Sequence, residues 1–281
     1  RSGRPGVSAE QLAEQRRALG LDDPIWQQYL DWVGGVVRLD FGKTYFSDYS
    51  TTELIRPRLV PSIELAVAAI LLALLIAVPT AIIAALRPHS AIDRSLTGFV
   101  TAGMALPPFW LAILLIALFA VKLGWLPTRG YVSPFADPVG NLRLLVLPAL
   151  TMAIVVAAPV LRFLRASLLE TLSSDFIRTA RGKGLSRRAV VLRHALPNGI
   201  LPTLTFVGLV VGSMLGGVVV VEYVFGWQGL GALAVDSVAK RDYAVLQAIV
   251  LLASAAFIAT SLAVDLLTFA LDPRHRLEAR R

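Results

Sequence analysis

The sequence contains no cysteine, only three histidines and few charged residues. Without cysteine, disulfide bonds and thiolate chemistry are excluded. The histidines, His89, His194 and His275, are isolated from one another, and none has the spacing of a metal-ligand pair. Serine, histidine and acidic residues cannot be grouped into a catalytic arrangement from their order either. We therefore expect that the chain is not itself an enzyme.

The scarcity of charge also bears on the class of protein. Charged residues make up 16% of the 281 residues, whereas apolar residues make up 56%. This composition is too apolar for an ordinary soluble domain and is typical of a membrane protein. The formal net charge is +8, but the basic residues cluster at the ends of apolar runs and not along one soluble face. We expect a lipid bilayer around the chain and no nucleic-acid partner.

Apolar runs long enough, or nearly so, to cross a bilayer occur five times in the sequence. A hydrocarbon core about 30 Å thick requires roughly 20 helical residues. The runs lie near residues 64–86, 97–121, 144–161, 200–221 and 245–271. Prolines in or beside them, such as Pro107 and Pro159, indicate kinked helices in a bundle. The predicted fold is an all-α polytopic membrane protein.

Residues 1–63 form a more polar region with short predicted helices. Ser8 and Gln11 resemble a capping box, and Gly20 would end the helix that follows. A second helix is predicted after Pro24, and it has one apolar face. We favour core packing for this face. The alternative is a partner surface or the membrane interface.

Lysine and arginine are unevenly distributed among the connections. Eight lie within residues 162–193 and four within residues 274–281. Because basic residues are retained on the inner side of the membrane, both segments, and therefore the C-terminus, are predicted to be cytoplasmic. Alternation then makes residues 1–63 extracytoplasmic. Such a region needs a route across the membrane, so we expect a sixth, N-terminal span in the natural protein that is missing from this sequence.

The segment Gly42-Lys43-Thr44 resembles the end of a phosphate-binding loop. That loop requires a glycine five residues before Gly42, where this chain has Val37. Gly35 lies two residues too early, and no strand is predicted before it. We therefore expect no ATP binding by this chain.

Residues 173–202 form a basic insert between two apolar runs. Apolar residues at helical spacing predict a first helix, which Ser173 or Ser174 would cap and Gly184 would end in the left-handed conformation. Ser186 would cap a second helix, which Pro197 would interrupt. The insert is therefore predicted to be a helix, a glycine turn and a helix.

The spacing within this insert resembles the EAA loop of permease subunits of bacterial ATP-binding-cassette (ABC) importers. The matching positions are Ala180, Gly184, Leu196 and Pro197. Three departures from the usual pattern resemble the dipeptide and oligopeptide permease branch, namely Arg178, Thr179 and His194. The resemblance extends nearly end to end and includes Glu64-Leu65-Ala66, Gly229-Leu230-Gly231, Arg241-Asp242-Tyr243 and Leu271-Asp272-Pro273-Arg274. It implies the transmembrane domain of a type I importer over residues 64–281.

The resemblance further implies that the loop at about residues 170–197 forms a coupling helix, which docks on a cytoplasmic ATPase. The residues assigned to this coupling are Phe176, Ile177, Arg178, Thr179, Ala180, Arg181, Lys183, Gly184, Leu196 and Pro197. Phe176, Ile177 and Ala180 are expected to form one exposed apolar side of that helix. The alternative is a basic loop that only obeys the positive-inside rule.

The implied function is ATP-driven import of di- and oligopeptides across the bacterial cytoplasmic membrane by alternating access. The implied partners are a homologous second permease, two cytoplasmic ATPases that bind ATP and magnesium, and an extracytoplasmic solute-binding protein. We expect no cofactor on this chain, and its substrate-contacting residues are unassigned. The same machinery with nickel, glutathione or an oligosaccharide as cargo is one alternative. An ion-coupled secondary transporter is another.

Several residues near the predicted spans have structural interpretations. Gly208, Gly212 and Gly216 are spaced by four and predict close helix packing. Asp265 is an intramembrane carboxylate, for which a structural polar contact is favoured over a proton relay. Glu222 falls near an outer span end, where we expect water to be close. The predicted interfacial anchors are Trp125, Tyr131, Tyr223 and Trp227.

Overall fold

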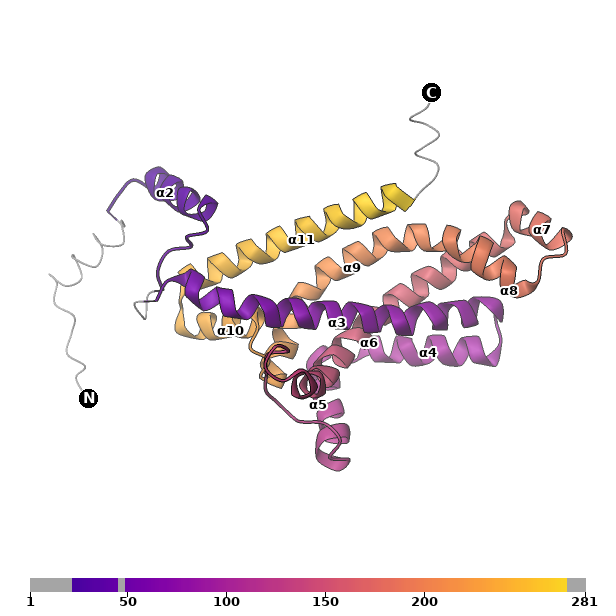
Figure 1. The fold of residues 1–281 in the computed structure, drawn as a ribbon, viewed down its shortest axis with the longest axis horizontal. Coiled ribbons are helices and arrows are strands. Elements are labelled where there is room, and N and C mark those ends of the chain that lie inside the picture. Colours follow the sequence, from indigo (N-terminus) through magenta and orange to yellow (C-terminus); the bar gives the residue numbers. More distant parts are fainter. Residues whose placement is uncertain (1–21, 45–48, 272–281) are drawn as a thin grey trace, which may run out of the picture.

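The computed structural model describes residues 22–44 and 49–271 (Figure 1). In these residues the regular structure is helical, apart from one isolated antiparallel bridge between Lys43 and Ser50. The predicted all-α polytopic fold is therefore confirmed. The capping box at Ser8 and Gln11 and the basic residues of the tail lie outside the described residues.

The helices follow one another along the chain in a simple order. They are α2 (Ile25–Val37), α3 (Thr51–Leu86), α4 (Ala91–Ala105), α5 (Pro108–Leu115), the π-helix η1 (Ile116–Lys122), α6 (Pro138–Ser173), α7 (Asp175–Gly182), α8 (Arg187–Ala189), the π-helix η2 (Val190–Ala195), α9 (Leu196–Phe225), α10 (Leu230–Lys240) and α11 (Tyr243–Leu271). Within the described residues, four helical stretches are long and apolar enough to cross a bilayer, namely α3, α6, Arg187–Gly212 and α11. Two bent pairs, α4 with α5 and η1 together, and the end of α9 with α10, pass the same test only when each pair counts as one span.

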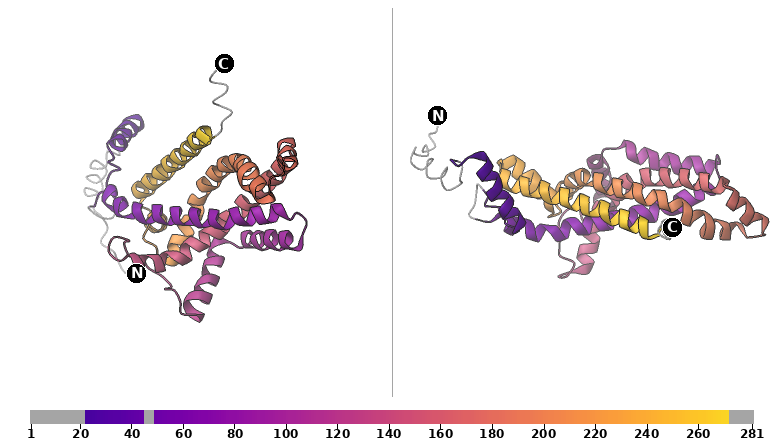
Figure 2. Two further views of the ribbon diagram at one scale, coloured as in Figure 1. Left: turned by 45° about the vertical axis from the view of Figure 1, so that its right-hand side comes forward. Right: turned by 90° about the horizontal axis from the view of Figure 1, so that it is seen from above.

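The long helices extend lengthwise through the molecule, and α9 and α11 are inclined to α3 (Figures 1 and 2). Helix α6 packs against α3 on one side and α9 on another, and α11 packs against α9. At one extremity lie α7, α8 and the turn between α3 and α4, and at the other lie α10 and α2. We refer to these extremities as the α7 end and the α10 end.

The packing of α3 on α6 depends on small side chains. Ala69, Ala73, Ala77 and Ala81 follow Leu65 at every fourth position of α3, and none of these five residues exposes any surface. They belong to one core cluster that also contains much of α6. Because small residues spaced by four allow two helix backbones to approach closely, this stripe explains the extensive contact between α3 and α6.

The second predicted span, near residues 97–121, is not a single helix. Helix α4 ends at Ala105, and α5 follows at an angle of 106°. Pro107 and Pro108 supply no backbone N–H, and a residue before proline is driven into extended conformation. Leu106 accordingly has φ −86° and ψ 130°. The kink that these prolines predict is therefore a break between two helices.

Helix α2 contradicts the favoured prediction of core packing. None of its residues is buried. Trp26, Tyr29 and Leu30 each expose more than half of their surface. Only the end of the helix reaches the bundle, where Val36 packs in a cluster with Phe41. Within residues 22–44 and 49–271, no segment covers the apolar face of α2, in agreement with the alternative of a partner surface or a membrane interface.

The segment Gly42-Lys43-Thr44 forms part of the corner at the α10 end. Gly42 has φ +80°, and its carbonyl accepts from the backbone N–H of Thr51 at 2.9 Å. The hydroxyl of Thr44 donates to the carboxylate of Asp242, directly before α11. This segment therefore connects the start of α3 to the start of α11.

Candidate functional site

Helix α7 follows α6 almost directly. Ser174 is the only residue between the two helices. Its backbone N–H and its hydroxyl both donate to the carbonyl of Thr171, at 3.1 and 2.6 Å. Ser174 thus occupies the predicted N-cap position of α7, although its side chain bonds back to α6. As a result, no flexible linker separates α7 from α6.

The turn after α7 matches its prediction. Gly184 has φ +77°, and its N–H donates to the carbonyl of Arg181 at 3.0 Å. The hydroxyl of Ser186 accepts from the N–H of Ala189 at 3.3 Å and so caps α8. Pro197, in contrast, does not interrupt the second helix. It occupies the first turn of α9, where the absent N–H is tolerated, and the helix continues to Phe225.

The apolar residues of α7 do not share one exposed side. Ile177 is 0% exposed and Ala180 is 7% exposed, and both pack in a cluster with Val190 and Ala195 of η2. Phe176 is 47% exposed. The expectation of a common apolar side is therefore wrong. Ile177 and Ala180 hold α7 against the returning helix, and Phe176 faces outward.

The polar residues assigned to α7 and its turn are exposed. The guanidinium of Arg178 lies 3.5 Å from the carboxylate of Asp175, and because both side chains are solvated this pair adds little stability. The hydroxyl of Thr179 donates to the backbone carbonyl of Asp175 at 3.0 Å. Lys183 caps the end of the helix. Together these residues give α7 a basic, solvated outer surface around Phe176.

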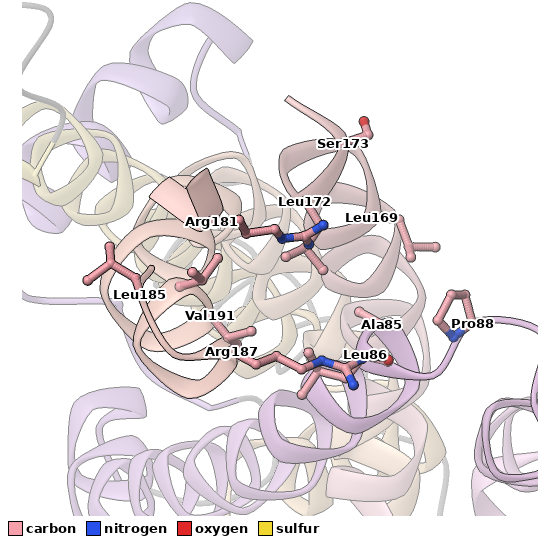
Figure 3. Close-up of a pocket in the computed structure, with 11 residues that line it drawn as sticks. Ala85, Leu86, Pro88, Leu169, Leu172, Ser173, Arg181, Leu185, Arg187 and Val191 are labelled. Carbon is pink, nitrogen blue, oxygen red and sulfur yellow. Dashed lines mark hydrogen bonds between the residues drawn. The ribbon is translucent and has the colours of Figure 1, made fainter. Parts of the chain in front are cut away.

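A pocket lies between the α7–α8 loop and the ends of α3 and α6 (Figure 3). It is lined by Ala85, Leu86, Pro88, Leu169, Leu172, Ser173, Arg181, Leu185, Arg187, Val190 and Val191. The side chain of Arg181 extends toward Leu172, and that of Arg187 extends toward Leu86. Nη2 of Arg187 donates to the carbonyl of Leu86, the last residue of α3. The loop that carries α7 therefore contacts α3 as well as α6.

An ion pair fixes the turn between α3 and α4 to α6. Nε and Nη2 of Arg165 donate to the two carboxylate oxygens of Asp93, at 2.7 and 2.6 Å. The backbone N–H of His89 donates to the same carboxylate at 2.9 Å, and the hydroxyl of Ser90 accepts from the N–H of Asp93 at 3.1 Å. This pair was not predicted from the sequence. The signal for it was an acid and an arginine at the matching ends of two adjacent apolar runs.

At the α10 end, Glu222 is 0% exposed, which corrects the expectation of nearby water. Its carboxylate accepts from the hydroxyl of Ser62 at 2.6 Å and from the N–H of Ala232 at 3.0 Å. The group lies at the N-terminus of α10, where unpaired N–H groups and the helix dipole favour a negative charge. A methyl group added at Gly229 or Gly231 would collide with this carboxylate. The two glycines are needed for the close approach of Glu222.

Trp227 is likewise buried, which corrects its assignment as an interfacial anchor. Its Nε1 donates to the carbonyl of Pro61 at 2.8 Å, and its ring packs edge-on against Tyr131 at a centroid distance of 4.8 Å. Gly226, with φ +61°, ends α9, and α10 follows at an angle of 87° to the end of α9. The pKa of Tyr131 is raised above its ordinary value. Burial is the larger cause, and the neighbouring carboxylate of Glu64 is the second.

Two of the glycines predicted to pack against another helix face α11. A methyl group at Gly208 would lie 3.1 Å from Val264, and one at Gly212 would overlap the ring of Phe257. The surroundings of Gly216 lie outside the described part of the structure.

The other predicted residues lie apart from α7. Asp265 is on the exposed side of α11, and within the described residues it makes no polar contact. Leu196 packs on the main core cluster at the start of α9. Leu196 and Pro197 thus support the base of the loop and do not lie at its exposed tip.

Comparison with known proteins places this architecture in a family. Residues 77–277 match the family described as binding-protein-dependent transport system inner membrane component. The glutathione transport system permease protein GsiC of Escherichia coli (strain K12) is 41% identical over 272 residues, which cover 97% of this chain and 86% of that protein. The oligopeptide transport system permease protein AppB of Bacillus subtilis (strain 168) is 37% identical over 273 residues, which cover 96% and 86%.

Solved structures show the same fold at much lower identity. The inward-facing MetNI methionine ABC transporter aligns with a TM-score of 0.65 and 15% identity over 78% of this chain and 96% of the solved one. An amino acid ABC transporter with histidines aligns with a TM-score of 0.59 and 18% identity over 77% and 94%. By family, relatives and fold, the chain belongs to the binding-protein-dependent inner membrane components and is a non-catalytic permease subunit of a bacterial ABC importer, in the dipeptide and oligopeptide branch.

Proposed function

We propose that this chain is one of two permease halves of an importer that moves di- and oligopeptides into the cytoplasm by alternating access. The observation that carries the proposal is the construction of α7. Phe176 is exposed at the tip of the molecule, while Ile177 and Ala180 are buried behind it. Because Ser174 alone separates α7 from α6, a displacement of α7 is passed directly to a helix of the core.

The proposed orientation places the α7 end in the cytoplasm. The connections at this end carry a concentration of basic residues, which bacterial membrane proteins retain on the inner side. Helix α11 runs back from the α10 end toward the α7 end (Figure 1), so the C-terminus is proposed to be cytoplasmic too. Residues 1–63 and the corner around α10 are then extracytoplasmic, and residues 64–281 form the transmembrane domain.

In this arrangement, Phe176 enters a cleft on one of two cytoplasmic ATPases. A single aromatic side chain in a pocket is a typical anchor of a protein interface, and surrounding charge adds specificity. Arg178 and Lys183 supply that charge for an acidic rim. ATP and magnesium are held by the ATPases, and this chain binds neither. The motion reaches α6 through Ser174 and α3 through the contact of Arg187 with Leu86.

Peptides are the proposed cargo class because the two relatives are named for peptides. GsiC is named for glutathione, which is itself a tripeptide, and AppB is named for oligopeptides. An extracytoplasmic solute-binding protein delivers the peptide to the α10 end. Glutathione is the second candidate, favoured by the 41% identity to GsiC. A secondary transporter is disfavoured because such carriers use paired intramembrane charges, and Asp265 pairs with no basic group among the residues that the structure describes.

Reconstitution of the complete importer in proteoliposomes tests the proposal. Binding protein loaded with a labelled peptide of three to five residues should accelerate ATP hydrolysis and deliver label to the lumen. Unloaded binding protein is the control. Competition by glutathione separates the two cargo candidates. An unchanged rate of ATP hydrolysis together with no peptide uptake would refute the proposal.

A further inference from the structure

The pocket at the α7 end contains cationic groups without acidic partners. Among the residues that the structure describes, no carboxylate pairs with Arg181 or Arg187. Arg187 is held in place by the carbonyl of Leu86, and the guanidinium of Arg181 reaches toward Leu172 (Figure 3). Two guanidinium groups that line one pocket attract an anion, because each offers several N–H donors in a planar arrangement.

The rest of the pocket is aliphatic. Its walls include Leu169 and Leu172 of α6 and Val190 and Val191 of η2. Inorganic phosphate would bind the guanidinium groups but would leave this aliphatic lining without an apolar partner. A molecule with an anionic head and an aliphatic chain would satisfy both parts of the lining. The lining therefore selects an amphiphilic anion over a free one.

The position of the pocket along the helices fits such a molecule. Helix α3 has 36 residues and is about 54 Å long, whereas a hydrocarbon core is about 30 Å thick and the bilayer with its headgroups about 40–45 Å. The ends of α3 therefore extend into or past the headgroup layer. Leu86 is the last residue of α3 and Ser173 is the last of α6, so the pocket lies near headgroup depth.

We propose that this pocket binds the headgroup of an anionic phospholipid of the cytoplasmic leaflet. Arg181 and Arg187 donate to the phosphate oxygens, and an acyl chain lies along Leu169 and Leu172. Because Arg181 belongs to α7 and Arg187 contacts the end of α3, the lipid stabilises α7 against both long helices. The inference rests on the membrane orientation proposed above, but it concerns lipid and not cargo.

Native mass spectrometry of the assembled importer tests this proposal. The complex is purified from membranes and exchanged into mixed micelles that contain equal amounts of phosphatidylglycerol and phosphatidylcholine. The wild type should retain phosphatidylglycerol in preference to phosphatidylcholine. The double variant Arg181→Gln/Arg187→Gln should lose this preference by roughly tenfold or more, since charge-assisted hydrogen bonds are removed. Arg188→Gln is the matched control, because Arg188 neighbours Arg187 without lining the pocket.

Leu172→Trp provides a second test. The larger side chain fills the aliphatic part of the pocket, and the charge of the pocket stays unchanged. It should reduce lipid retention as the double variant does, and it serves alone if the double variant fails to assemble.

Equal retention of both lipids by the wild type would overturn the proposal, and this is the result expected if the ATPase or inorganic phosphate occupies the pocket. An equal loss in Arg188→Gln would overturn it as well. If the importer transports peptide but shows no lipid preference, the lipid inference is refuted and the proposed function stands. If the importer shows the lipid preference but transports no peptide, the result counts against the proposed function.

Discussion

Arg165 of α6 and Asp93 of α4 form a two-pronged ion pair, with nitrogen to oxygen distances of 2.7 and 2.6 Å. The side chain of Asp93 is 5% exposed and that of Arg165 is 22% exposed. The pair thus lies at the α7 end, largely shielded from water, and joins the turn between α3 and α4 to the helix that carries α7.

Loss of one partner from this pair should destabilise the chain. Asp93→Asn leaves Arg165 with an uncompensated charge, and removal of one partner of a buried pair costs about 3 kcal/mol. Arg165→Gln should have a similar effect. The double variant should be little worse than either single variant, because no unpaired charge remains. Thermal unfolding of the purified protein in detergent measures these differences. Arg178→Gln, which breaks the exposed pair with Asp175, is the control, and additive losses would contradict the pairing.

Phe176 and Ile177 are sequence neighbours with opposite surroundings, so their replacement should have different effects. Phe176→Ala should weaken association with the ATPase by about 2 kcal/mol, as expected for an aromatic interface anchor, and leave the stability of the chain unchanged. Ile177→Ala should lower the free energy of unfolding by about 2 to 4 kcal/mol, because it empties part of the cluster with Val190. Co-purification of the ATPase and thermal unfolding separate the two effects. Equal behaviour of the two variants would contradict the assignment of Phe176.

Glycine should be required at position 184 because of the positive φ angle there, and not because neighbouring atoms leave no room for a side chain. No atom lies within 4 Å of the position that a methyl group would take there, but φ is +77°. A β-branched residue is strained in this region by about 1 to 2 kcal/mol, so Gly184→Val should reorient the turn. We expect peptide uptake per ATP hydrolysed to fall while the complex still assembles. Gly182→Val is the control, because Gly182 is equally uncrowded and has no positive φ. If both variants transport alike, the turn is not needed for coupling.

Gly231 should tolerate no side chain. A methyl group there would lie 2.5 Å from Cα of Val219 and 2.9 Å from the carboxylate of Glu222. Because the backbone of α9 cannot move aside cheaply, Gly231→Ala should lower the free energy of unfolding by about 2 kcal/mol or more. Gly34→Ala in α2 meets no atom within 4 Å and should be neutral or stabilising by up to about 1 kcal/mol, because alanine favours a helix. Thermal unfolding of the two variants gives the comparison, and an equal response would exclude a steric role for Gly231.

Local chemistry made the turn after α7 predictable. Gly184 is left-handed and Ser186 caps the following helix, as their residue types predicted. These features depend on a few neighbouring residues, so the sequence contains all that is needed to predict them. Pro197 was misjudged, because a proline in the first turn of a helix and a proline that ends one look alike without knowledge of the helix boundaries.

Which side of an amphipathic helix is covered could not be predicted. The pattern of α7 identifies Phe176, Ile177 and Ala180 as apolar, but not that the chain returns through Val190 and covers two of them. The same holds for α2, whose apolar face has the pattern of a packed helix and lies free. Such outcomes depend on contacts between distant segments.

The polar contacts at both ends of the bundle could not be predicted from the sequence either, because they join residues that are far apart along the chain. Asp93 and Arg165 are 72 residues apart, and Glu222 and Ser62 are 160 apart. An acid near the end of an apolar run is usually solvated, and this expectation failed for Glu222 because Gly226 turns the chain back over it. The spacing of Gly229 and Gly231 was the available signal, since paired glycines at a helix start leave room for a buried group.

The direct junction of α6 and α7 at Ser174 has a geometric consequence for transport. Helix α6 contains 36 residues and is about 54 Å long. If it turns as one body about its midpoint, a tilt of about 8° moves each extremity by about 4 Å, in opposite directions. An ATPase that displaces Phe176 by this amount therefore moves Asn141 by a nearly equal distance. Asn141 lies about one helical turn from Pro138, the first residue of α6. A small tilt of α6 that begins at the α7 end is thus sufficient to move the other end of this helix by a comparable distance.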